Sequence, residues 1–342
     1  ACSELLGDDL ADANGYSLRE AARAASEADG LSLCERIQQQ QQQQAQQHTG
    51  VATVYVIWHR STSVATLLSA LHNLVECTPC TLRTCFWLRE ASMAFASGGE
   101  EAQVRAVPLV IGAINHSVLV LERAHLYAQS LPLRCALCVS ELAFSMARHC
   151  GFWLAMTDDD EDYLHLKLLQ TLEVFDGTLA GAPGGVVDAS RTSCRRGLKH
   201  ETDADGHPPN AASELKALLG ASLGFLHANV LVVTLLTKAL VAEGRSALRR
   251  LPEPSRAPSK IALDLARLLQ RVGATNEATA LLQAAVSASQ QAHGPADRQT
   301  LERQLRLAAC YFGQDRVDEA AALLRSCFEV SRVALGDLTP ET

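Results

Sequence analysis

The sequence has no excess of basic residues. Its 342 residues include 30 lysines and arginines against 38 aspartates and glutamates, so the formal net charge is -8. Proteins that hold nucleic acid by its backbone neutralise phosphates with clustered cations. Because no such surplus is present, we expect no nucleic-acid partner, and the expected partners are proteins or small molecules.

Several catalytic and secretory signals are also missing. There is no P-loop, no GxGxxG after a predicted strand and no nucleophile elbow, so kinases, P-loop NTPases and esterases have no local support. Eleven cysteines are too few for a disulfide scaffold in a chain of this length, and no secretory signal opens the sequence. We therefore expect a cytoplasmic protein with reduced thiols.

Long uncharged runs are scarce, with one exception. Residues 217–237 carry no charge and are long enough to cross a bilayer, with Gly220 and Gly224 in GxxxG spacing. His227 and Asn229 lie near the middle of this run, where polar groups are costly in lipid. The sequence therefore favours a buried helix over a membrane span.

From Gly50 onward the sequence contains apolar strands that alternate with helices. The runs VATVYVIW, TLRTCFWL, SVLVLE, GFWLAM and LEVFD are separated by stretches of helical periodicity. Continuous apolar strands are typical of parallel sheets buried on both faces, and right-handed crossovers return each strand in the same direction. The pattern predicts an α/β doubly wound parallel sheet over residues 50–176.

The flanking segments differ in composition from this domain. Residues 1–49 predict an N-terminal helix followed by a Gln-rich spacer, to which we assign no role. Residues 177–210 are rich in Gly, Pro and charge and predict a flexible linker or surface loop. Residues 211–258 predict connector helices, and residues 259–342 form a repeat region.

The repeat region has a period of 42 residues. A shift of that length places Leu265 on Leu307 and Ala278 on Ala320, and each unit predicts two antiparallel helices. Such arrays generally need about three or more units. Because the chain begins with Ala rather than Met and ends inside a repeat at Thr342, we expect a fragment of a longer protein whose array continues.

The segments RVDEAAALL, HGPADRQTL and LGDLTPET resemble tetratricopeptide repeats of the kinesin light chain type. The resemblance covers about residues 260–342. It implies an all-α solenoid that binds protein partners in a groove and carries no chemistry of its own.

Two Cys-x-x-Cys pairs allow several interpretations. Cys135 and Cys138 lie near the start of a predicted helix, which favours a reactive thiol, whereas the apolar neighbours of Cys138 favour a buried and inert one. Together with Cys77 and Cys80 they allow a zinc site, but no short knuckle turn surrounds either pair. The acidic run at residues 157–163 is better explained as the first turn of a helix than as a cation site. We expect no metal.

The segment LPLRCALCVSEL, residues 131–142, resembles PLxRxWCLxEL of Toll/interleukin receptor (TIR) domains, and of TIR-like domains fused to light-chain repeats in algae and protists. Cys138 and Glu141 match the cysteine and glutamate of that segment. VYVIWHRS resembles the first strand of the family, with Arg60 at its arginine, and CFWLRE resembles the second strand. The order of elements fits over residues 50–176.

The TIR resemblance implies two possible roles for the α/β domain. In active members the glutamate supports cleavage of the N-glycosidic bond of NAD by stabilising the ribosyl cation, which makes Glu141 the candidate catalytic residue and Arg60 the candidate NAD-binding residue. NAD would then be a substrate, and no resident cofactor is expected. Other members only assemble with one another, which implies a homo-oligomer.

Three departures from the TIR pattern oppose activity. Trp58 replaces a small serine at the end of the first strand, Arg89 occupies the usual aspartate position, and Leu137 replaces a tryptophan. In the structural interpretation Glu141 is a carboxylate on the helix surface, paired with Arg134 or Arg148. The sequence as a whole predicts a protein-interaction or signalling scaffold that acts through its repeats, with an NAD glycohydrolase using Glu141 as the alternative.

Overall fold

The structure is a computed structural model in which the chain forms two compact units. The first comprises Ala1–Leu164 with Glu173–Leu235, and the second comprises His165–Leu172 with Leu236–Thr342. The structure describes residues 13–41, 50–77, 84–93, 99–126, 131–180 and 223–335.

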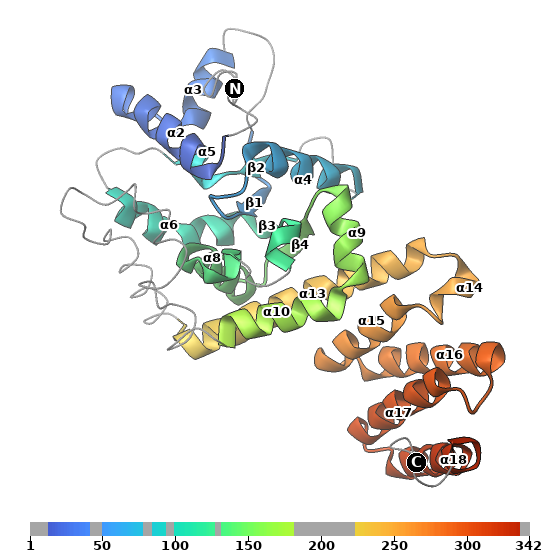
Figure 1. The fold of residues 1–342 in the computed structure, drawn as a ribbon. Helices are drawn as coiled ribbons and strands as arrows, with labels where there is room; N and C mark the ends of the chain where they lie inside the picture. Colours follow the sequence, from blue (N-terminus) through green and yellow to red (C-terminus); the bar gives the residue numbers. More distant parts are fainter. Residues whose placement is uncertain are drawn as a thin grey trace. The chain divides into compact units, whose positions relative to one another are not determined.

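The first unit contains a parallel sheet of four strands in the order β2-β1-β3-β4 (Figure 1). This is the order of the first four strands in flavodoxin-like doubly wound sheets. The predicted α/β fold class is therefore confirmed. The strands are β1, Val54–Ile57; β2, Phe86–Trp87; β3, His116–Val120; and β4, Gly151–Ala155.

Helices cover both faces of the sheet, as continuous apolar strands require. Val54, Val56 and Trp58 point toward one face and share a core with α4, whereas the alternate residue Tyr55 points toward the other face and α8. Figure 1 shows α4 on one side of the strands and α6 and α8 on the other. These helices are α4, Val64–Cys77; α6, Gly99–Ile114; and α8, Ala136–Ala147.

The predicted N-terminal helix is confirmed and belongs to the core of this unit. Asn14 caps it by accepting from the backbone N–H groups of Tyr16 and Ser17, and Gly30 ends it in the left-handed conformation. Ala13 and Leu18 are buried in the same core as α4. The group of helices is α2, Gly15–Asp29; α3, Leu33–Gln41; and α5, Arg89–Ser92.

Gly15 lies where α2 meets the end of β1. Its N–H donates to the carbonyl of Arg60 at 2.8 Å. A Cβ at this position would lie 2.7 Å from the Arg60 Cα and 3.0 Å from the Trp58 ring. Only glycine permits this approach, so α2 covers the end of the strand directly.

The run LEVFD, predicted as a strand, is helical, and that prediction is wrong. Leu168, Leu172 and Phe175 recur at helical spacing and are all buried, a period that extends beyond the five residues of the run. The shorter elements and this helix are η2, Arg123–Leu126; α7, Leu131–Arg134; α9, Asp158–Leu166; and α10, Leu168–Ala180.

Other predictions concern segments that the structure describes only in part. The predicted linker at 177–210 begins inside α10, and the remainder lies outside the described residues. The glutamine tract runs into α3 as far as Gln41, and its remainder is likewise outside them. In the apolar run 217–237, a helix begins at Phe225. No helix in the described part of the chain is long and apolar enough to cross a membrane.

The second unit is helical, and its last four helices form two successive hairpins (Figure 1). The 42-residue period is confirmed in the packing, because Ala266 and its equivalent Ala308 are both buried. The helices from the connector onward are α13, Phe225–Arg250; α14, Glu253–Arg256; α15, Lys260–Arg271; α16, Thr275–His293; α17, Arg298–Gly313; and α18, Val317–Leu335.

Candidate functional site

Glu141 lies on the side of α8 that faces the sheet. Its side chain is 1% exposed, so the interpretation as a helix-surface carboxylate is wrong. The Tyr55 hydroxyl donates to Oε1 of Glu141 at 2.7 Å, and Arg89 donates to the same oxygen. Arg89, rather than Arg134 or Arg148, is the ion-pair partner that the structure gives to Glu141.

A second carboxylate extends these contacts to the other face of the sheet. Arg89 donates from Nη2 to Glu90 at 2.8 Å, and Trp58 donates from Nε1 to Glu90 at 3.1 Å. Arg60 reaches the same carboxylate from Nε at 3.4 Å. We call this group the buried ion network, and its members are Tyr55, Trp58, Arg60, Arg89, Glu90 and Glu141.

The alternation of β1 explains how the network forms. Tyr55 points toward α8 and Trp58 points toward α4 and α2, so the two side chains lie on opposite faces of one strand. Arg89 and Glu90 begin α5, directly after β2 at the edge of the sheet. From this position Arg89 bonds to Glu141 on one face, and Glu90 bonds to Trp58 on the other.

The two carboxylates of the network have opposite pKa shifts. Burial raises the pKa of Glu141 to about 7, although Arg89 and the Tyr55 hydroxyl favour its ionised form. Burial also disfavours ionisation of Glu90, but Arg89 and Arg60 outweigh it and hold the pKa of Glu90 at about 2. Glu90 is therefore the permanent anion, and Glu141 is the group that exchanges a proton near neutral pH.

Two polar atoms of the network are unpaired within the described part of the chain. They are Oε2 of Glu141 and Nε of Arg89, and both are buried. Buried polar atoms usually have a partner, because leaving one unpaired costs about 1–3 kcal/mol. Chemically, the pair offers a proton-exchanging carboxyl oxygen beside a guanidinium, but a substrate reaches it only after neighbouring side chains move.

Two histidines lie at the carboxyl ends of β1 and β3, where doubly wound sheets bind ligands. His59 follows β1, and His125 accepts from the backbone N–H of Glu122 after β3. Burial lowers the pKa of His125 to about 4, with a further lowering by His59. Neither histidine is predicted from the sequence above, although the position of each just after a strand was a usable signal.

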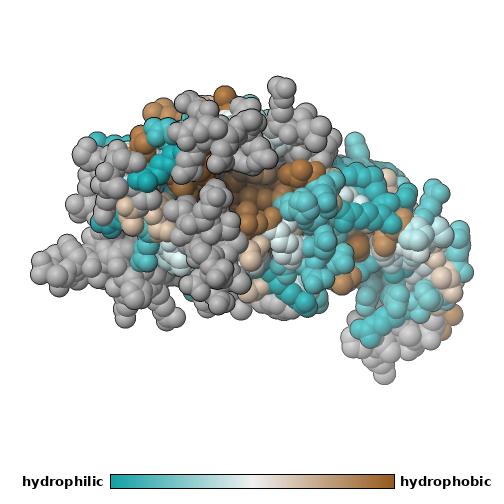
Figure 2. Space-filling model, turned by 90° about the horizontal axis from the view of Figure 1, so that it is seen from above, coloured by the Kyte–Doolittle hydropathy of each residue, from teal (hydrophilic) through white to brown (hydrophobic). Residues whose placement is uncertain are grey.

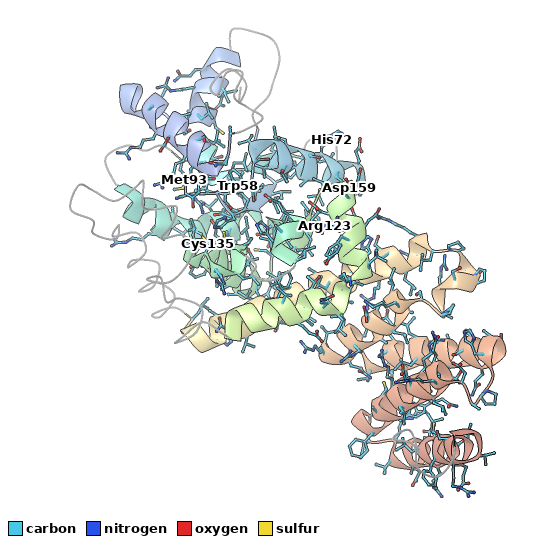
Figure 3. The ribbon with its side chains drawn as sticks, viewed as in Figure 1. Trp58, His72, Met93, Arg123, Cys135 and Asp159 are labelled. Carbon is cyan, nitrogen blue, oxygen red and sulfur yellow. The ribbon has the colours of Figure 1, made fainter. Side chains whose placement is uncertain are left out.

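The cysteine and acidic motifs have structural contacts. Cys138 is buried and donates to the Trp58 carbonyl at 3.4 Å, which confirms the prediction of a buried thiol. Figure 3 labels Trp58 beside the strands and Cys135, at the start of α8, below them. Cys77 is exposed on α4, and Cys80 lies outside the described residues. The acidic run forms the first turn of α9, as predicted.

The repeat hairpins carry a different candidate surface on α17. One side of this helix packs inward, including Leu301, Leu307 and Tyr311. On another side Leu305 is 49% and Phe312 is 68% exposed. We call the second side the α17 stripe; its positions recur at helical spacing and are Arg298, Glu302, Leu305, Ala309 and Phe312.

On the repeat helices, exposed large apolar side chains occur in the α17 stripe and on α18, on a surface that is otherwise mainly polar. Figure 2 shows mainly hydrophilic residues over the C-terminal helices, with isolated hydrophobic ones between them. The equivalent positions on α15, 42 residues earlier, are Leu263, Arg267 and Gln270, and of these Leu263 and Gln270 are only partly exposed. Among the described repeat helices, large exposed apolar side chains are therefore concentrated on the second hairpin.

The repeat hairpins match a known type of helical repeat. The sequence profile described as tetratricopeptide repeat matches residues 259–332, which include α15, α16 and α17 and most of α18. Comparison of the whole chain with curated proteins gives no match. The repeat match, together with the two observed hairpins, indicates a scaffold for protein–protein interaction.

Proposed function

We propose that this protein binds protein partners through the α17 stripe of its tetratricopeptide repeats and acts as a cytoplasmic interaction or signalling scaffold. The observation that carries the proposal is the exposure of Leu305 and Phe312 inside the region that matches the repeat family. Apolar side chains on a helix that is already packed on its other side are available to a partner.

The composition of the stripe supports a polypeptide partner. Leu305, Ala309 and Phe312 offer an apolar strip for side chains of the partner, and Phe312 supplies an aromatic anchor of the kind that dominates binding energy. Arg298 and Glu302 form an exposed ion pair at the other end, with their atoms 3.3 Å apart. Apolar anchors beside a polar rim are typical of protein interfaces.

The proposal also includes the type of the repeats and the family of the α/β domain. We infer repeats of the kinesin light chain type from their junction sequences, and a TIR-like α/β domain from the motifs around Glu141. The strand order of the sheet supports the second assignment. In this account the α/β domain contributes self-assembly, and the repeats select the partner.

The test compares the proteins that three forms of the chain retain from the source cells. The forms are the wild type, a Leu305→Asp and Phe312→Asp double variant, and a Leu109→Asp control on α6, where Leu109 is 69% exposed. We expect a set of proteins that wild type and control retain and the double variant loses. If all three forms retain the same proteins, the α17 stripe is not the binding surface.

Cleavage of NAD by Glu141 is a second proposal, with a narrower basis. The observations that favour it are the pKa of Glu141 near neutrality and the unpaired Oε2 beside Arg89. An anionic oxygen at that position would stabilise a developing ribosyl cation. Nicotinamide release from NAD by wild type but not by Glu141→Gln supports this reaction. Equal rates, or no release by either form, exclude it.

A further inference from the structure

The first repeat hairpin carries cations at positions equivalent to the α17 stripe. A shift of 42 residues places Arg267 of α15 on Ala309, inside the stripe. Arg271 follows four residues later on the same face of α15, and both arginines are exposed. Successive hairpins of an array present equivalent positions on the same side. The arginines of α15 and the α17 stripe therefore belong to one surface.

The structure places the two helices of this surface in the same stack. In Figure 1 the repeat helices follow one another from α15 to α18, and α16 packs against both α15 and α17. Arg303 on α17 donates from Nη2 to the carbonyl of Pro258, just before α15, at 3.3 Å. A bound peptide that contacts the stripe and extends toward the first hairpin therefore reaches the arginines of α15.

The charge of the first helices is opposite in sign to that of the chain. α15 and α17 each contain three basic residues and one carboxylate, whereas the whole chain has a formal net charge of -8. The second helices, α16 and α18, each have one carboxylate more than they have lysines and arginines. The positive charge of the repeats is therefore concentrated on the helix that carries the stripe and on its equivalent in the first hairpin.

The carboxylates of the two first helices neutralise only part of this charge. Asp264 of α15 is 6% exposed and bonds to Lys260 at 3.1 Å. The carboxylate of α17 belongs to the exposed ion pair at the end of the stripe. Arg267 and Arg306 are exposed, and within the described part of the chain neither bonds to a carboxylate. These two guanidinium groups are available to a partner.

The positions of the two arginines indicate the chemistry of that partner. Arg306 follows Leu305 directly, so a cation borders the apolar strip. Guanidinium groups bind carboxylates through two parallel N–H···O bonds. Nucleic-acid phosphates accept the same bonds, but they require a larger excess of cations than this chain has. The surface therefore fits a polypeptide that carries carboxylates beside apolar side chains.

We propose that the segment bound by the repeats is an acidic peptide. Its apolar side chains contact Leu305 and Phe312, and its aspartates or glutamates contact Arg267 and Arg306. This inference rests on the proposed function, because it names the chemistry of the partner that the α17 stripe binds. Exposed ion pairs are screened by salt, so the affinity should fall as the salt concentration rises.

Selection of random displayed peptides on the purified full chain tests the proposal without knowledge of the partner. We expect wild type to enrich peptides that combine aspartate or glutamate with large apolar residues. The Arg267→Glu and Arg306→Glu double variant should lose these peptides and enrich others with lysine or arginine in place of the acidic residues. This exchange is expected only when the two arginines contact the peptide.

The matched control reverses the same amount of charge elsewhere in the helical unit. It is the Arg249→Glu and Arg325→Glu variant, in which two exposed arginines change on α13 and α18. This control should enrich the same peptides as wild type. Circular dichroism should show unchanged helix content in both variants, because all four arginines are exposed.

The affinity of one enriched acidic peptide measures the contact itself. The charge reversal at Arg267 and Arg306 should raise its dissociation constant by about tenfold, because two exposed ion pairs become repulsive contacts. Alanine in place of the acidic residues of the peptide should weaken binding to wild type. It should have little effect on binding to the Arg267→Ala and Arg306→Ala variant, since groups in contact have non-additive effects.

Failure of this inference is distinguishable from failure of the proposed function. Enriched peptides that lack an excess of acidic residues, and that the Leu305→Asp and Phe312→Asp variant loses, would overturn the inference and leave the proposed function in place. Acidic peptides that this variant retains, or no enrichment by wild type, would contradict both. Binding of single-stranded RNA by wild type but not by the charge-reversed variant would assign the arginines to phosphate groups and overturn the inference.

Discussion

At the residue scale, the buried ion network determines how the α/β domain responds to pH. Glu141, Arg89 and Glu90 are all buried, and each bonds to at least one other member. Removing one partner from such a network leaves an uncompensated charge, which is strongly destabilising. The network therefore joins β1, α5 and α8 whether or not Glu141 has a chemical role.

The pKa of Glu141 predicts a loss of stability with rising pH. It rises from 4.5 to about 7 on folding, so between these values the folded domain holds a proton that the unfolded chain has released. Stability from this group is complete below pH 4.5 and falls as pH rises to 7, by about 3 kcal/mol. Glu141→Gln removes the titration and should not show this loss.

Tryptophan fluorescence measures this effect in the correct domain, because Trp58, Trp87 and Trp153 are the three tryptophans of the chain and all lie in the sheet unit. Urea unfolding of wild type and Glu141→Gln at pH 4.5 and pH 7 gives the difference directly. Other titrating groups, including His59 and His125, contribute equally to both forms and cancel. The same pH dependence in both forms would contradict the assignment.

Gly15 gives a second prediction at the residue scale. A methyl group there meets the Arg60 backbone at 2.7 Å, and backbone atoms do not yield easily. We expect Gly15→Ala to lower the free energy of unfolding by about 1–3 kcal/mol. The control is Gly112→Ala inside α6, where the nearest atom is 3.7 Å away, and it should stabilise the domain by about 0.5–1 kcal/mol. Similar effects at both positions would contradict the close approach of α2.

At the element scale, the second helices of the two hairpins differ in what covers them. Leu282 on α16 is 2% exposed, whereas its equivalent Leu324 on α18 is 45% exposed. Burial of an apolar side chain sets the cost of truncating it. The same substitution at the two positions therefore compares a covered and an open face within one repeat pattern.

We expect Leu282→Ala to destabilise the repeats by about 2–5 kcal/mol, and Leu324→Ala by less than about 1 kcal/mol. Thermal unfolding followed by circular dichroism measures both. Equal costs would mean that the α18 face is covered within a single chain.

Prediction of the elements from the sequence succeeded where the periodicity was long. The four observed strands and the two hairpins follow from apolar runs and from the 42-residue period. The prediction of a strand for LEVFD was wrong because five residues do not distinguish a strand from part of a helix. In α10 the spacing of Leu168, Leu172 and Phe175 decides the question.

The candidate site was less predictable than the fold. A motif indicated Glu141 and Arg60, but their contacts depend on residues distant in the sequence: Tyr55 and Glu141 are 86 positions apart, and Arg89 and Glu141 are 52 apart. Only the folded chain shows toward which face of the sheet each side chain points. It also shows that α5 lies at the edge of the sheet. Arg89, noted as a departure from the TIR pattern, proves to be the counter-ion of Glu141.

At the scale of the whole molecule, the chain combines a doubly wound sheet with a pair of repeat hairpins. The sheet unit contains the buried ion network, and the repeat unit exposes apolar residues on α17 and α18. This distribution supports the proposal that the repeats bind the partner protein. We propose that the partner protein contacts the α17 stripe.

Photocrosslinking tests that claim most directly. A benzophenone amino acid in place of Phe312, in the full chain in its source cells, should give a light-dependent adduct with another protein. The same probe in place of Leu109, which is equally exposed on α6, should not give that adduct. The account predicts an adduct specific to position 312, and the same adducts at both positions, or none at position 312, would contradict it.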